Sequence, residues 1–365
     1  MKHTLWILAL LVPGIAAVDM AFALPRFASR TAAKCQSCHV NPSGGGMRQT
    51  FGVTYGRNQL PVPTWSEELD LEDFSTQLTD FVSIGANFRT LFFHFDSGSS
   101  STNAFFQMQG DIYMNLKLAK KVSIYLDKGL YAGFEIFGLL NLLPANGYIK
   151  VGKFLPNFGT KMDEHRAFIR TFTGFNPEFG RAELTGAEVA VLPGPLTIMG
   201  GIYNARDGFG AGTGKDKAYL GRADAIFKAT SDIHVGIGGN VFRRENSTGP
   251  KITLLGGLGS VSVKDLTLFG EVDLMRTEVA GTTTDALITY AELNYVLMQG
   301  LDLKFAYDFF DPDKDTKSGT FSRYTFGFEF FPVSGVEVRP LYRILKEDPI
   351  DVDNNEFHLL FHFYL

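Results

Sequence analysis

The sequence predicts an all-β transmembrane barrel of about 16 antiparallel strands, preceded by a small N-terminal segment that is mostly helical or irregular. Three observations support this prediction. From residue 81 onward apolar and polar residues alternate with a period of two. The alternating runs are about 9–15 residues long, as a tilted membrane strand requires, whereas soluble strands usually have about 5–6 residues. The chain is rich in Phe (34) and Gly (39), yet its mean hydropathy is only +0.02. Such a neutral mean indicates that lipid-facing and lumen-facing positions are finely interleaved.

The alternation is clearest in the C-terminal half of the chain. In 301–309 every odd position is apolar, and three of the four even positions are charged. The apolar positions Leu266, Leu268, Val272 and Leu274 oppose a polar set that lies one residue away from them. The expected strands are 81–95, 103–118, 121–128, 131–142, 146–154, 182–192, 195–204, 217–228, 232–244, 250–262, 264–277, 284–296, 300–310, 319–331, 334–346 and 354–365.

The connections between these strands predict the orientation of the barrel. Short turns alternate with longer polar connections, and bacterial barrels place short turns in the periplasm and long loops outside. We therefore expect both ends of the barrel domain, 81–365, on the periplasmic side of the outer membrane of a Gram-negative cell. The stretch 121–181 is compatible with 14 strands as well as 16. Its connection 155–181 is the longest in the barrel, and it is a candidate for a segment that folds into the lumen.

Residues 1–23 have the features of a secretory signal peptide. Lys2 and His3 form a short basic start, 4–18 is apolar, and 21–23 reads Ala-Phe-Ala, a typical cleavage site. The apolar run is shorter than the roughly 20 residues that a transmembrane helix needs. We expect the mature chain to begin near Leu24 and to be exported.

The segment 24–80 contains the only two cysteines of the chain, Cys35 and Cys38, and His39 follows directly. A C-x-x-C-H sequence is the attachment motif of a c-type haem, with thioethers at both cysteines and the histidine as the proximal iron ligand. A disulfide or a thiol oxidoreductase is the alternative for two cysteines in an oxidising compartment, but a thioredoxin-like site requires a βαβ context. The sequence therefore predicts one covalent haem c. At about 55 residues the segment is small for an independent core, so we expect the haem or the barrel wall to complete its packing.

The distal ligand of such a haem is not defined by the motif. Met47 lies eight residues after His39 and follows three glycines that allow the chain to curl. His234 and His362 alternate with apolar residues, so both are expected to point into the lumen near the periplasmic ends of their strands. His358 shares the face of His362. These are the candidates for the distal iron ligand, each against the alternative of an ordinary core or lumen residue. His94 falls on the apolar face and is expected at the membrane interface.

The chain has a signal peptide, one C-x-x-C-H motif and a barrel, in that order, and Pro25-Arg26-Phe27-Ala28 precedes the motif. This arrangement resembles the fused monohaem cytochrome–porins of the outer membrane, which are best known from iron-oxidising bacteria. The architectural match covers the whole chain, and the motif match covers about 20 residues. That family has an aromatic-Pro-x-Leu stretch after the haem motif, whereas this chain has 41–50 in its place and keeps Phe51-Gly52. The resemblance implies an Fe(II):cytochrome c oxidoreductase, if the chain is catalytic.

These observations predict electron transfer between an extracellular donor, with Fe(II) as one candidate, and a periplasmic c-type cytochrome. Two acidic loops, 311–315 and 347–353, would concentrate a ferrous ion, or simply bind divalent ions at the lipid surface. The alternative is a diffusion porin whose haem segment is a plug, or a docking site for a multihaem cytochrome. The net charge of −5 argues against a nucleic-acid partner.

Overall fold

The computed structural model describes residues 25–32, 34–68, 75–96, 101–130, 133–176, 182–206, 216–316 and 318–365. The predicted signal peptide, 1–23, lies outside these residues. Within the described ranges no helix is both long enough and apolar enough to cross a bilayer.

Among the described residues helices are few and short. The described part of the segment before the barrel contains three of them and one 3₁₀ turn, and a fourth helix lies in the described part of the connection 155–183. Their bounds are α1 (Pro25–Thr31), η1 (Cys35–Ser37), α2 (Thr50–Asn58), α3 (Pro63–Glu68) and α4 (Phe168–Thr171).

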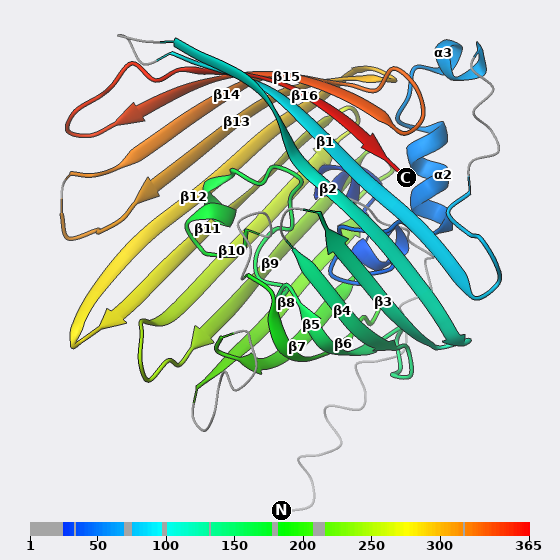
Figure 1. Cartoon of the computed structure of the whole chain (residues 1–365), viewed down its shortest axis with the longest axis horizontal. Coiled ribbons are helices and arrows are strands. Elements are labelled where there is room, and N and C mark those ends of the chain that lie inside the picture. The colour runs from blue at the N-terminus through cyan, green and yellow to red at the C-terminus, as the bar shows by residue number, and fades with distance from the viewer. Residues whose placement is uncertain are drawn as a thin grey trace, which may run out of the picture.

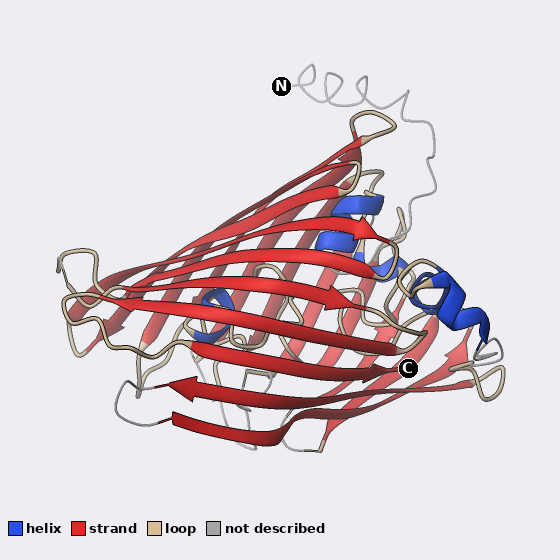
Figure 2. Cartoon of the chain, turned by 90° about the horizontal axis from the view of Figure 1, so that it is seen from above, coloured by secondary structure: helices blue, strands red, loops and turns tan. Residues whose placement is uncertain are grey.

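Sixteen described strands form one closed antiparallel barrel, in which every strand pairs with its sequence neighbours and β1 pairs with β16 (Figures 1 and 2). The strands are β1 (Val82–Asp96), β2 (Ser101–Ala119), β3 (Val122–Gly129), β4 (Phe134–Leu140), β5 (Tyr148–Phe154), β6 (Leu184–Val191), β7 (Leu196–Asn204), β8 (Lys217–Lys228), β9 (Ile233–Arg244), β10 (Lys251–Val263), β11 (Leu266–Val279), β12 (Thr282–Met298), β13 (Leu301–Asp311), β14 (Phe321–Phe330), β15 (Val336–Glu347) and β16 (Glu356–Tyr364). The prediction of about 16 strands is confirmed, and the 14-strand alternative is wrong.

We call the two ends of the barrel the turn end and the loop end. The turn end carries the start of β1, the C-terminus and the β2–β3, β10–β11 and β12–β13 turns, whereas the loop end carries the opposite connections, including 155–183. One predicted long connection at the loop end is in fact a tight turn. Thr282, Thr283 and Thr284 pair with β11 instead of forming a loop. Strands β11 and β12 are therefore joined through Ala280 and Gly281, and both of these residues have positive φ.

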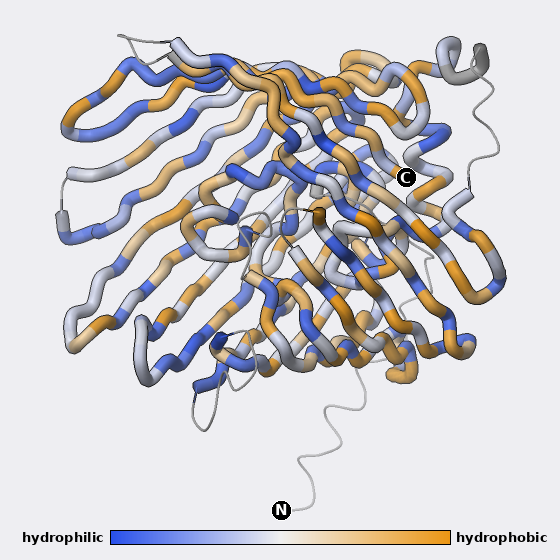
Figure 3. Tube along the Cα trace, in the orientation of Figure 1, coloured by the Kyte–Doolittle hydropathy of each residue, from blue (hydrophilic) through white to orange (hydrophobic). Residues whose placement is uncertain are grey.

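The two faces of the strands differ as predicted. Leu266, Leu268, Val272 and Leu274 are exposed on the outside, whereas their inward neighbours Thr267, Phe269, Glu271 and Asp273 are buried. In Figure 3 the hydropathy alternates along the strands accordingly. Outward apolar side chains such as these suit a hydrocarbon surrounding.

The lumen is entered by the chain from both ends. The helix α1 contacts β9, β10 and β11 on the inside of the barrel, and α2 lies at the turn end near the C-terminus (Figure 1). From the loop end, α4 contacts β11, β12 and β13. Both α1 and α4 lie within the barrel outline in the two perpendicular views (Figures 1 and 2). The expected inward folding of the connection after residue 155 is confirmed.

Candidate functional site

The C-x-x-C-H motif forms one tight turn inside the barrel. The backbone N–H groups of Cys38 and His39 both donate to the Cys35 carbonyl, at 3.1 and 3.0 Å. His39 then pairs with Arg48 in an isolated antiparallel bridge, so the chain doubles back immediately after the motif. No disulfide joins the two cysteines, and Cys38 is buried whereas Cys35 is partly exposed. The turn therefore brings two thiols and one imidazole into a single loop.

Glycines shape this loop by close approach to their neighbours. Gly44, Gly45 and Gly46 all have positive φ (88°, 72° and 63°), a conformation that costs other residues about 1–2 kcal/mol each. A Cβ at Gly46 would lie 2.1 Å from the Tyr125 hydroxyl. A Cβ at Gly52 would lie 2.3 Å from the Cys38 carbonyl oxygen. The Phe51-Gly52 pair noted in the sequence thus has a packing role, because Gly52 lets α2 lie directly against the motif.

Basic residues of the N-terminal segment bind it to two separate parts of the barrel wall. Arg26 forms a bidentate ion pair with Glu329, at 2.6 and 2.9 Å, and Arg30 pairs with Asp302 at 2.7 Å. The Lys34 ammonium donates to three backbone carbonyls of the β6–β7 turn. Charged hydrogen bonds of this kind are roughly twice as strong as neutral ones.

Aromatic and apolar side chains hold the opposite side of the loop. Met47 is buried in a cluster with Tyr113, Tyr125 and Phe137 from β2, β3 and β4, and its backbone N–H donates to the Tyr125 hydroxyl at 3.1 Å. Polar contacts supplement this packing. The Lys150 ammonium, fully buried against Glu188, donates to the Ser43 hydroxyl at 2.8 Å. The barrel wall therefore supplies the core that the small segment lacks, as expected from its size.

Two cavities adjoin the motif. The first, about 170 Å³, is lined by Cys38 and His39 together with His362, and the second, about 140 Å³, is lined by Cys35 and His39. His39, Gly45 and Lys161 line both, so the cavities meet at these residues. A group that is attached at both cysteines therefore faces open space on either side of His39.

The chemistry of these residues fits a covalent haem. Burial, followed by the positive charges of Arg48 and Lys161, lowers the pKa of His39 to about 3, so the imidazole is neutral at pH 7 as an iron ligand must be. Its Nδ1 is buried without a hydrogen-bond partner among the described residues. Burial also raises the pKa of the Cys35 thiol. A c-type haem requires two thiols that form thioethers with the porphyrin and one neutral imidazole that binds the iron, and these are the groups present here.

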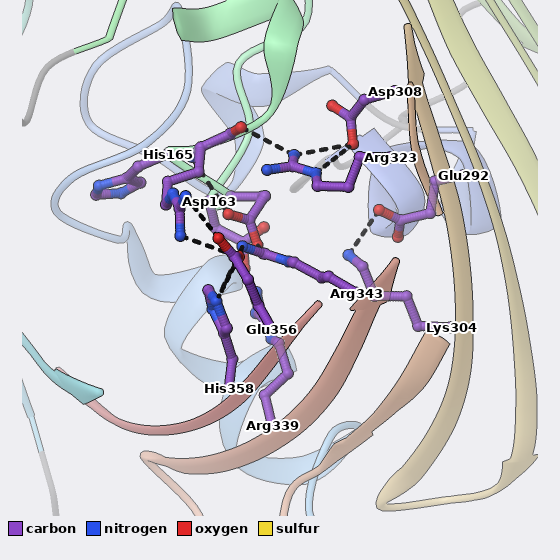
Figure 4. A network of polar contacts seen from close by, with 12 residues as sticks. Asp163, His165, Glu292, Lys304, Asp308, Arg323, Arg339, Arg343, Glu356 and His358 are labelled. Carbon is purple, nitrogen blue, oxygen red and sulfur yellow. Dashed lines mark hydrogen bonds and ion pairs between the residues drawn. The ribbon is translucent and has the colours of Figure 1, made fainter. Parts of the chain in front are cut away.

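The inward-folded connection separates this site from the loop end. Asp163 lines the first cavity and also a third one of about 350 Å³ on the other side, so it forms part of the partition between them. Arg339 pairs with Asp163, and the Arg89 guanidinium donates to the Asp163 carbonyl at 2.7 Å. Glu164 pairs with Arg343 at 2.7 Å. Figure 4 shows Asp163 of the connection near Arg339 and Arg343 of β15, among polar residues of β12 to β16.

The charged groups of this network are almost fully buried. Arg339 and Arg343 expose 1% of their surface, and Asp308 exposes 1%. Asp308 accepts the backbone N–H of Phe168 at 2.8 Å and pairs with Arg323 at 2.8 Å. In an open water-filled barrel such side chains would be hydrated. Their burial follows from the connection that covers them, so the connection narrows the lumen at this level.

The candidates for the distal ligand that the sequence predicts lie in different surroundings in the structure. His362 lies at the wall of the first cavity, with Cys38 and His39. Met47 is packed in the aromatic cluster and His234 lines neither cavity next to the motif. His358 lines the third cavity, and its Nε2 lies 2.9 Å from Glu356. His94 pairs with Phe357 on the outward face, as expected for a residue at the membrane.

Two residues of the site were not singled out from the sequence. Glu337 contacts His362, and Arg339 pairs with Asp163 of the partition. Alternation indicates that Glu337 and Arg339 face the lumen. It does not indicate that Arg339 meets Asp163, because Asp163 lies in a connection without periodicity.

The acidic loops at 311–315 and 347–353 lie at the loop end, away from the motif. Lys346 pairs with Asp351 there, at 2.5 Å. Within the described ranges no group of three or more His, Cys, Asp or Glu side chains is arranged to hold a metal ion.

Comparison with known proteins identifies the fold of this chain but assigns it to no family. No protein-family model matches the chain, and no curated protein matches it. Among solved structures it is similar to OmpT of Vibrio cholerae (TM-score 0.57, 12% identity, 80% of this chain and 100% of that one). It is also similar to the anion-selective porin of Comamonas acidovorans (TM-score 0.54, 8% identity, 78% and 99%). A BenF-like porin from Pseudomonas fluorescens matches with TM-score 0.50 and 10% identity over 79% and 100%. The chain therefore has the fold of the outer-membrane β-barrel porins.

Proposed function

We propose that this protein transfers electrons at the outer membrane of a Gram-negative cell, through one haem c attached to Cys35 and Cys38 with His39 as the proximal ligand. The observation that carries the proposal is the position of the motif. The two thiols and the neutral imidazole lie inside the lumen, next to cavities that adjoin His39. A haem held there would supply a one-electron Fe(III)/Fe(II) couple.

The two insertions that narrow the lumen support electron transfer over diffusion of solutes. The N-terminal segment enters from the turn end, and the connection after residue 155 enters from the loop end. Ion pairs such as Arg26–Glu329 and Arg343–Glu164 hold both insertions to the wall. Because the bilayer and its headgroups are about 40–45 Å thick, one cofactor cannot span it alone. A site within the lumen shortens the distance to a donor at the loop end, and α2 and α3 stand at the turn end, where a periplasmic cytochrome would dock.

Ferrous iron is the donor that the resemblance suggests. Each Fe²⁺ would lose one electron to the site and leave as Fe³⁺, and a periplasmic c-type cytochrome would accept that electron. A multihaem cytochrome, or electron flow in the opposite direction, fits the same architecture.

The test is a spectrum of intact cells that express the full chain together with a cytochrome maturation system. We expect a covalent c-type haem whose reduced bands appear promptly when Fe²⁺ is added outside the cells. The matched control is the Cys35→Ser/Cys38→Ser double variant, which should form the barrel without covalent haem. Absence of covalent haem in the unaltered protein would overturn the proposal. A haem that dithionite reduces and external iron does not would keep the cofactor and exclude iron as the donor.

The second candidate is a diffusion porin in which the N-terminal segment is a plug or docking site. The fold alone favours it, because two of the similar structures are described as porins. Ion conductance in planar bilayers separates the two functions. Electron transfer through a narrowed barrel predicts little conductance, whereas a porin predicts a stable open channel.

A further inference from the structure

His362, on the last strand, has one ring nitrogen in a polar contact and the other without a hydrogen-bond partner among the described residues. His362, on the inward face of β16, exposes 4% of its surface. Its Nδ1 lies 2.7 Å from a Glu337 carboxylate oxygen. Its Nε2 is buried and has no hydrogen-bond partner within the part of the chain that the structure describes. A buried polar atom without a partner costs free energy, so its presence calls for an explanation.

The tautomer of His362 determines whether its Nε2 can act as a metal ligand. A carboxylate only accepts hydrogen bonds, so the ring nitrogen that faces Glu337 carries the proton. In the neutral imidazole the other nitrogen, Nε2, then holds an unshared electron pair. Histidine ligands of metals have this arrangement, with one N–H donated to a carboxylate that fixes the ring and makes it more basic.

The surroundings connect His362 to the motif. Both His362 and His39 line the first cavity. Arg48, the bridge partner of His39, stacks its guanidinium 4.3 Å above the Tyr364 ring, and that ring lies 5.0 Å from the ring of His362. The loop that follows the motif is thus tied to the end of the strand that carries His362.

Other candidate ligands lack this combination. The His165 ring also lines the first cavity, but its Nε2 lies 3.1 Å from an Arg89 guanidinium nitrogen. His358 has its Nε2 at Glu356 and faces the third cavity. Met47 lies in the aromatic cluster, outside the walls of the first cavity.

We propose that His362 is the distal axial ligand of the haem and that Glu337 is its positioning residue. The inference rests on the proposed haem at Cys35, Cys38 and His39, and it adds the sixth ligand and the residue that orients it. Two histidines on the iron leave no open coordination position, so the site transfers electrons and does not bind small gaseous ligands.

The test uses the purified full-length protein with its covalent haem. Electron paramagnetic resonance of the oxidised protein should show low-spin iron with two histidine ligands, and the reduced protein should not bind carbon monoxide. His362→Ala should become high-spin and bind carbon monoxide, and added imidazole should restore the low-spin signal. The matched control is His358→Ala, on the same strand and face, which should leave both properties unchanged.

Glu337→Gln tests the positioning residue separately. The iron should stay low-spin, while the reduction potential rises because a neutral acceptor makes the imidazole a weaker electron donor. A purely structural role of Glu337 predicts an unchanged potential in the folded variant. Slower migration on a gel after heating checks that each barrel is folded.

The outcomes separate this inference from the proposed function. A protein without covalent haem contradicts the proposed function itself. A protein with covalent haem that is high-spin when unaltered, or that stays low-spin in His362→Ala without imidazole, overturns the assignment of His362 and leaves the haem attachment intact.

Discussion

The two sides of the lumen hold the inserted chain by different means. On β3 to β5 a row of inward aromatic side chains, Tyr125, Phe137 and Phe154, has ring centroids 5.0 and 5.7 Å apart. On β12 to β16 the inward residues include a buried charged cluster, with Lys304 and Arg339 both next to Glu329. The aromatic wall packs against the loop of the C-x-x-C-H motif, whereas the charged wall binds α1 and the connection from the loop end. Packing tolerates small changes in shape, but a buried charge without its partner is expensive.

The charged wall should therefore be the more sensitive side. Arg339→Ala leaves Asp163 and Glu337 without their guanidinium, and breaking a buried pair costs about 3–5 kcal/mol. We expect the connection to leave the partition, and planar-bilayer conductance should rise severalfold. The matched control is Arg276→Ala, whose pair with Asp285 is exposed on the outside of the barrel end. Equal conductance in the two variants would show that the ion pairs do not hold the partition.

Acidification should act on the same wall. Burial alone would raise the pKa of Glu164, but the guanidinium of Arg343 outweighs burial and holds that pKa well below its ordinary value of 4.5. A depressed pKa in the folded state means that the contribution to stability is complete above about pH 4.5 and is lost as the pH falls toward the folded value. Conductance should increase on acidification below pH 4.5. In Glu164→Gln that increase should be smaller, and an identical pH profile would contradict this assignment.

The aromatic wall should respond to a change of shape in the loop. Gly46 has a φ of +63°, and a Cβ there would lie 2.1 Å from the Tyr125 hydroxyl. Gly46→Ala should cost about 1–2 kcal/mol for the left-handed conformation, in addition to the displacement of Tyr125. The measurement is the thermal unfolding of the purified protein. Gly281→Ala is the control, because it also has positive φ but a Cβ there meets nothing within 4 Å. A larger loss in Gly281→Ala would contradict the proposed tight packing.

Removal of a single hydroxyl should have the smallest effect. Tyr125→Phe keeps the ring and deletes the acceptor for the Met47 backbone N–H. The net contribution of such a hydrogen bond is about 0.5–1.5 kcal/mol. Hydrogen exchange at the Met47 amide should become faster while the barrel signals stay unchanged. An unchanged exchange rate would indicate that this contact does not hold the loop.

The difference between the walls also explains what the sequence could predict. The strands and their inward faces follow from local alternation, and the order of Glu329, Glu337 and Arg339 on that face is visible in the chain itself. The candidate ligands Cys35, Cys38 and His39 follow from one motif. The contact of Asp163 with Arg339 joins residues 176 positions apart, one of them in a connection without periodicity. Nothing local encodes that pairing.

The selection of His362 among the histidines needed three-dimensional information for the same reason. Alternation predicts that His234, His358 and His362 all face the lumen, and it treats them equally. They differ in which cavity they line and in which nitrogen is already bonded. Those differences arise from where the N-terminal segment settles against the wall. That position depends on ion pairs such as Arg26–Glu329, between residues 303 positions apart.

The position of Cys38 within a closed barrel imposes an order on biogenesis. Cys38 exposes 1% of its surface, and the barrel around it is sealed by the pairing of the first strand with the last. An enzyme that modifies a thiol needs access to an unfolded stretch of chain, which the finished barrel does not offer. Covalent chemistry at Cys38 must therefore come first, while the exported chain is still in transit. If the proposed haem is attached there, the assembly machinery has to close β16 onto β1 around a segment that already carries the haem.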